Sequence, residues 1–140
     1  MQDFSDLIFL MGAMLVISLL TVNTGYMFRN NSETLMQADI EYEAIALAQS
    51  LINDVKWEND IDEIDPASGS CICNSYPQTQ TVEIGSGSQF EVDYTVDLQS
   101  VEENIVGSNV RNFRVTVIVT SDYLPPDQAI QMQFLKNFAN

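Results

Sequence analysis

The feature that most constrains this chain is an uninterrupted run of uncharged residues near its N-terminus. Between Asp6 and Arg29 stand 22 residues without a charge, LIFLMGAMLVISLLTVNTGYMF. As an α-helix such a run is about 33 Å long, because each residue adds about 1.5 Å. That length matches the hydrocarbon core of a bilayer. The run therefore predicts a helix that spans a membrane or packs against other apolar helices.

The residues on either side of the run do not fit a cleaved secretory signal. A signal peptide has a basic segment before the apolar run and a small-residue cleavage site after it. Here Asp3 and Asp6 precede the run, and TVNTGYMF at its end offers no such site. We therefore expect the segment to be retained. Arg29 by itself would place its end of the helix in the cytoplasm, unless a segment removed earlier set the orientation.

Small and polar residues interrupt the apolar character of the run. Gly12 and Ser18 would let neighbouring helices approach closely. Thr21, Asn23 and Gly25 lie in the stretch TVNTG, whose residue types have low helix propensity. One interpretation is a single-pass anchor whose polar end lies at the membrane interface. The other is a helix that packs against copies of itself and unwinds locally at 21–25.

A second helical pattern follows over residues 32–56. Its apolar residues recur at spacings of three and four, which predicts one apolar stripe: Ile40, Ala44, Leu47, Ala48, Leu51 and Val55. No proline precedes Pro66, so the two helical segments can form one rod of about 55 residues. Trp57 ends the pattern, and we expect it to be a core or subunit contact. The stripe needs a cover, which a sheet provides.

The remaining chain predicts a loop followed by strands. Residues 58–79 are rich in Asp, Asn, Ser, Gly and Pro, which is typical of a loop. Alternating apolar residues then predict a short strand, two longer strands and a fourth, edge strand, over 81–84, 89–98, 112–120 and 129–138. Gly107, Ser108 and Asn109 supply a turn. The predicted fold class is α+β, a long N-terminal helix on a small antiparallel sheet of three or four strands, divided as 1–28, 29–57 and 58–140.

The charge balance excludes several classes of function. The chain has 20 acidic and 5 basic residues, a net charge of −15, and no histidine. Such a surface disfavours nucleic acid and anionic lipid headgroups, both of which need basic patches. Without histidine the usual Ser-His and Cys-His arrangements are absent, and no glycine-rich phosphate loop is present. We expect neither an enzyme nor a bound cofactor.

In layout the chain resembles the type IV pilin superfamily of pilins, secretion pseudopilins and archaeal flagellins. The resemblance rests on the apolar N-terminal run, on EYEAIALAQSLINDV at 41–55 and on FRVTVIVTSDYLPP at 113–126. It implies a subunit stored in the cytoplasmic membrane and then assembled into a helical, extracellular filament. The implied partners are copies of the chain, the membrane, and an assembly machinery of ATPase, platform protein and prepilin peptidase.

The resemblance also implies roles for particular residues. The bundled core of the filament would comprise Leu7, Ile8, Leu10, Met14, Leu15, Ile17, Leu19, Leu20 and Val22. Family members commonly have a glutamate inside the apolar run that pairs with a neighbour's terminal amine, and this chain has none there. Asp6, and then Asp3, is the nearest substitute for that registration, although interfacial solvation explains both equally. The family's helix-breaking proline is also absent, and Gly25 or Gly12 would take its role.

Two features of the loop bear on ligands and redox state. Asp60, Asp62 and Asp65 in DIDEID offer oxygen ligands for Ca²⁺ but lack the spacing of an EF-hand, so a solvated acidic turn is the preferred interpretation. Cys71 and Cys73 are too few for a zinc site. They are expected to form a local disulfide, with free thiols and intermolecular bonds as alternatives.

The function expected from the sequence is therefore a structural subunit of a type IV pilus-like filament. A pseudopilin of a secretion system keeps the same fold and is one alternative. A single-pass, membrane-anchored binding module outside the cytoplasm is the other. The first two differ from the third in whether the apolar helix ever leaves lipid.

Overall fold

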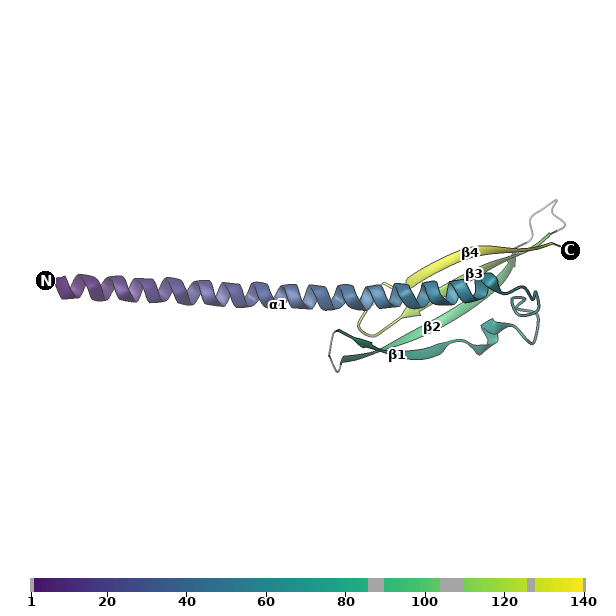
Figure 1. Cartoon of the computed structure of the whole chain (residues 1–140), viewed down its shortest axis with the longest axis horizontal. Helices are drawn as coiled ribbons and strands as arrows, with labels where there is room; N and C mark the ends of the chain where they lie inside the picture. The colour runs from purple at the N-terminus through teal and green to yellow at the C-terminus, as the bar shows by residue number, and fades with distance from the viewer. Residues whose placement is uncertain (1, 86–89, 104–109, 126–127, 140) are drawn as a thin grey trace. The chain divides into compact units, whose positions relative to one another are not determined.

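The computed structural model describes residues 2–85, 90–103, 110–125 and 128–139. One long helix is followed by a short 3-10 helix and four strands (Figure 1). The chain divides into two compact units, Met1–Met36 and Gln37–Asn140. The first unit is helical, and the second contains the end of the helix and the whole sheet.

Helix α1 runs without a break over Gln2–Trp57, 56 residues, as the lack of an early proline predicts. A side chain distant in the sequence caps the C-terminal end of the helix. The ammonium of Lys136 donates hydrogen bonds to the backbone carbonyls of Lys56 and Glu58. Carbonyls in the last turn of a helix have no partner within the helix, so a lysine there satisfies them and favours termination.

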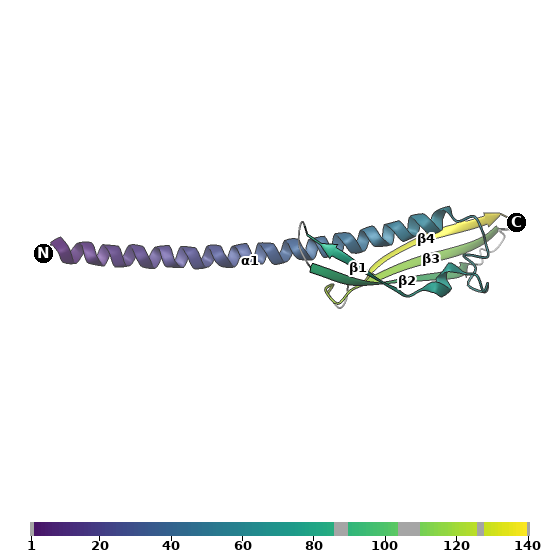
Figure 2. The same cartoon turned by 60° about the horizontal axis from the view of Figure 1, so that its bottom comes forward.

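The sheet is antiparallel with strand order β1-β2-β3-β4 (Figures 1 and 2). The strands are β1 (Gln78–Ile84), β2 (Phe90–Glu103), β3 (Val110–Thr120) and β4 (Ile130–Ala139). The predicted α+β class is confirmed. Strand β1 begins before the predicted residue 81 and β2 continues past 98, because polar residues there extend the backbone pairing without adding apolar alternation. The predicted turn at 107–109 lies outside the described residues.

The core forms between one face of the sheet and the second half of α1. From β2 it receives Val92, Tyr94, Val96 and Leu98, and from β3 it receives Phe113, Val115, Val117 and Val119. The helix contributes Ile40, Ala44, Ala48 and Val55, four members of the predicted stripe. Both alanines are 0% exposed. Small side chains at these positions allow the helix to lie close to the sheet.

Strand β4 is the edge strand that the C-terminal alternation predicts. Ile130, Met132, Phe134 and Phe138 pack against the core, whereas Gln131, Gln133 and Leu135 on the alternate positions are exposed. The ring of Phe138 meets Phe113 edge to face with centroids 5.9 Å apart. This contact and the Lys136 bonds fix the last strand to both layers of the domain.

Candidate functional site

The apolar N-terminal segment is the candidate functional site, because its side chains are exposed to solvent. The nine predicted core residues are each 55–66% exposed: Leu7, Ile8, Leu10, Met14, Leu15, Ile17, Leu19, Leu20 and Val22. Among the described residues α1 is the one helix long and apolar enough to cross a membrane, with a mean hydropathy of 2.1 over its 18-residue window. None of that window is buried. A continuous apolar surface of this kind marks a membrane or assembly contact.

The hydroxyl groups in this segment are satisfied within the helix itself. Ser18, Thr21 and Thr24 each donate a hydrogen bond of 2.8 Å to the carbonyl four residues earlier. An unpaired hydroxyl is costly in an apolar environment, whereas a paired one is tolerated. The segment can therefore enter lipid or a helix bundle without leaving these hydroxyl groups unpaired.

The small residues leave two shallow grooves on the helix surface. The first is lined by Ile8, Phe9, Gly12, Ala13, Val16 and Ile17. The second is lined by Ile17, Leu20, Thr21, Thr24, Gly25 and Phe28. A Cβ added at Gly12 or Gly25 would meet no atom of this chain within 4 Å. Packing within the subunit therefore does not require these glycines, and the grooves are open to a side chain of another molecule.

The predicted melting and registration residues have defined places in this helix. Thr21, Asn23 and Gly25 are helical in the isolated chain. Local unwinding at 21–25 is predicted for the assembled state, and it stays a prediction. Asp6 is exposed next to the first apolar residues, where a partner could reach its carboxylate. Asp3 lies in the first turns of the helix, but its side chain lies outside the described part of the structure.

Two of the three aspartates of the acidic loop, Asp60 and Asp65, have structural partners. The Asp65 carboxylate accepts a hydrogen bond from the Ala67 N–H at 2.9 Å and lies 2.7 Å from the Arg111 guanidinium. These two donors lower the pKa of Asp65, the Ala67 N–H more strongly. Asp60 accepts a bond from the Asp62 N–H. Within the described residues, no group of three or more carboxylates or cysteines is placed to hold a metal ion.

Arg111 links the loop to the sheet in a way the sequence pattern did not predict. Besides Asp65, it bonds Glu102 with its Nε at 2.8 Å from the carboxylate. This bond is the main cause that lowers the pKa of Glu102. The three residues are separated by up to 46 positions in the chain, so neither spacing nor periodicity brings them together before the strands pair.

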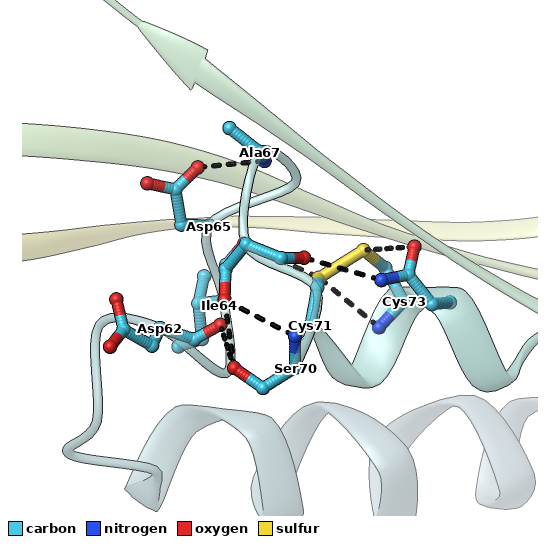
Figure 3. Close-up of a disulfide and its surroundings, with 9 residues drawn as sticks. Asp62, Ile64, Asp65, Ala67, Ser70, Cys71 and Cys73 are labelled. Carbon is cyan, nitrogen blue, oxygen red and sulfur yellow. Dashed lines mark hydrogen bonds between the residues drawn. A yellow bond between two sulfur atoms is a disulfide. The ribbon is translucent and has the colours of Figure 1, made fainter.

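The two cysteines form a disulfide within the loop (Figure 3). Their Cα atoms are 5.2 Å apart, and the Cys73 N–H donates to the Cys71 sulfur at 3.3 Å. Cys71 is buried, and the Ile72 N–H donates to the Glu63 carbonyl at 2.9 Å. The bridge encloses a single residue, so it removes little entropy from the unfolded chain. It shapes the loop locally.

Trp57 does not belong to the subunit core. Its side chain is 75% exposed at the end of α1, which leaves the other predicted role, a subunit contact. Comparisons of the chain with protein-family models, with curated proteins and with solved structures find no match.

Proposed function

We propose that this chain is a structural subunit of an extracellular type IV pilus-like filament, held together by bundled N-terminal helices. The observation that supports this best is the exposed apolar segment of α1, whose surface no described residue covers. The fold supports it as well, since a long N-terminal helix on a four-stranded antiparallel sheet is pilin-like in architecture. The role is structural and not catalytic.

The physical basis of the proposed assembly is the change in surroundings of the apolar side chains. In lipid they gain little by meeting one another, because lipid tails are as apolar as leucine. Outside the membrane each Leu or Ile that leaves water gains roughly 1.5–3 kcal/mol. Bundling therefore becomes strongly favourable once the helix is extracted. The extraction itself requires work, which an ATPase and a platform protein would supply.

The main rival is a monomeric, membrane-anchored module that displays its domain outside the cytoplasm. It uses the same helix, but the helix stays in lipid. Gly12 and Gly25 support the filament, because packing within the subunit does not require them and small residues let neighbouring helices approach closely. A short periplasmic pseudopilus shares the bundled helices and differs in length and location.

Cryo-electron microscopy of material sheared from the surface of producing cells tests the proposal, with the subunit identified by mass spectrometry. We expect helical filaments that contain this chain, with residues 7–22 at the axis. Recovery of the chain solely as a detergent-extracted monomer would contradict the proposal and support the anchored module. Filaments found in the periplasm alone would indicate the pseudopilin.

A further inference from the structure

The two ends of the folded unit Gln37–Asn140 bear opposite charges that no described residue pairs. The first end is the C-terminus of α1, where Lys56 stands next to the exposed Trp57. Three of the four basic residues in this unit are bonded within the chain: Arg111 to Asp65 and Glu102, Arg114 to Glu103, and Lys136 to backbone carbonyls. The Lys56 ammonium has no such bond to another described residue. Among the described residues of this acidic unit, it is the one cation without a bonded partner.

The second end is the hairpin between β1 and β2. Glu83 and Glu91 are directly opposed in the β1–β2 register, and both are exposed on the outer face of the sheet. Opposed residues have Cβ atoms about 5 Å apart, so two like charges there are destabilising. The next outer pair along the hairpin is Thr81 and Asp93, which join by a hydrogen bond of 2.6 Å. Neither Glu83 nor Glu91 has a bonded partner among the described residues.

These two surfaces lie at opposite ends of the same unit. Glu91 precedes Glu102 by 11 positions on β2, which at roughly 3.3 Å per residue is about 36 Å. Glu102 pairs with Phe113, and Phe113 with Lys136, whose ammonium bonds the carbonyl of Lys56. Figures 1 and 2 both show the C-terminal end of α1 at one end of the sheet and the β1–β2 hairpin at the other.

We propose that these surfaces bind each other between successive copies of the chain, with Lys56 and Trp57 of one copy seated on Glu83 and Glu91 of the next. A lysine placed between two opposed carboxylates relieves their repulsion and gains its own counter-charge. Trp57 supplies the apolar contact area at the junction, the role in which tryptophan is enriched at interfaces. Because the two surfaces differ and lie at opposite ends, the contact is head to tail. Such contacts propagate into open helical assemblies when the rotation between successive copies does not close a ring.

This inference rests on the proposed filament and identifies its contact outside the helical core. The first test uses the chain's single tryptophan, which is Trp57. Its fluorescence is measured with acrylamide as quencher, in detergent-solubilised subunit and in purified sheared filaments. We expect a blue-shifted emission and at least a severalfold lower quenching constant in the filament. Equal quenching in both forms would overturn the contact.

The second test exchanges charges. Lys56→Glu should reduce the filament yield from producing cells by roughly tenfold or more, since it replaces an attraction to two carboxylates with a repulsion. Combining Lys56→Glu with Glu91→Lys should restore the yield to near wild type. The matched control combines Lys56→Glu with Asp39→Lys, an exposed carboxylate on α1 in the other layer of the domain, and has the same net charge as the rescue variant. It should remain defective.

The outcomes separate this contact from the filament proposal. Thermal unfolding of each full-length variant in detergent checks whether the variant folds. We expect all of them to fold, because every exchanged side chain is exposed. If the Lys56→Glu variant assembles normally, or if Asp39→Lys rescues it as well as Glu91→Lys does, the proposed contact is wrong while the filament proposal stands. If the wild-type chain itself forms no filament, the proposed function is what fails.

Discussion

Tyr94 shows how one side chain ties the sheet to the helix. It is fully buried, and its hydroxyl donates a hydrogen bond of 3.0 Å to the Ile40 carbonyl. That carbonyl lies within α1 and can also accept its intrahelical bond, so the tyrosine uses its second lone pair. The neutral phenol is required here. Burial raises the pKa of Tyr94 to about 12, and the nearby Glu43 carboxylate adds to the shift.

Alkaline pH should therefore destabilise the fold through Tyr94. In the unfolded chain a tyrosine titrates near pH 10, so the contribution is complete below about pH 10 and is lost as the pH rises towards 12. Tyr94→Phe should cost about 1 kcal/mol at neutral pH for the lost hydrogen bond. Its thermal midpoint should fall less than that of the wild type between about pH 9 and about pH 11. Tyr123→Phe, an exposed control, should keep the wild-type pH dependence.

Asp6 is the residue predicted to set the registration between neighbouring subunits of the proposed filament. Its carboxylate is exposed beside the apolar segment, and a carboxylate at that depth is costly without a partner. Asp6→Asn keeps the shape of the side chain and removes its charge. We therefore expect the rate of filament formation to fall roughly tenfold, which corresponds to the loss of one charge-assisted contact. Electron micrographs of cells at timed intervals measure the rate. Filaments appearing at the normal rate would assign Asp6 to interfacial solvation alone.

At the scale of the elements, periodicity predicted most of the fold. The alternation of Phe90 to Leu98 and of Phe113 to Val119 correctly assigned β2, β3 and their inner faces. The sequence pattern did not predict the start of β1. Gln78, Thr79 and Gln80 show no apolar alternation, and they gain their strand conformation from pairing with β2. Long-range contacts such as that of Arg111 with Asp65 could not be predicted for a related reason, since only the strand register brings them together.

The grooves of α1 give a prediction at this scale. Gly12→Leu fills the first groove, and the added side chain meets nothing in its own chain. The variant should insert into membranes as well as the wild type, because leucine favours the bilayer. It should nevertheless lower the filament yield, with Gly12→Ala giving a smaller loss. Immunoblots of membrane and sheared fractions measure both quantities. An unchanged sheared fraction for Gly12→Leu would show that no neighbour occupies the groove.

For the molecule as a whole, the charge is concentrated in the folded unit. Of the net −15, the residues Asp3, Asp6, Glu33 and Arg29 account for −2, which leaves −13 on residues 37–140. Three of the four cations in this unit are bonded internally. Self-repulsion at this charge opposes compactness and opposes the approach of a second copy.

Ionic strength should therefore control both folding and assembly. The Debye length falls from about 30 Å at 0.01 M salt to about 3 Å at 1 M, which is shorter than the domain. We expect the thermal midpoint of the full chain in nonionic detergent to rise by several degrees from about 10 mM to about 1 M NaCl. Sucrose at equal osmolarity is the control for solvent exclusion. A midpoint that does not respond to NaCl would mean that the carboxylates are too well separated to repel.

The position of β4 at the end of the element order has a consequence for biogenesis. Translation delivers the apolar part of α1 first and β4 last. Until β4 arrives, β3 has an open edge, Phe113 lacks the Phe138 ring, and the end of α1 lacks the Lys136 ammonium. The apolar helix is thus available to a bilayer before the domain can close. In the proposed subunit, the domain therefore crosses the membrane as an unfolded polypeptide and completes its fold on the far side.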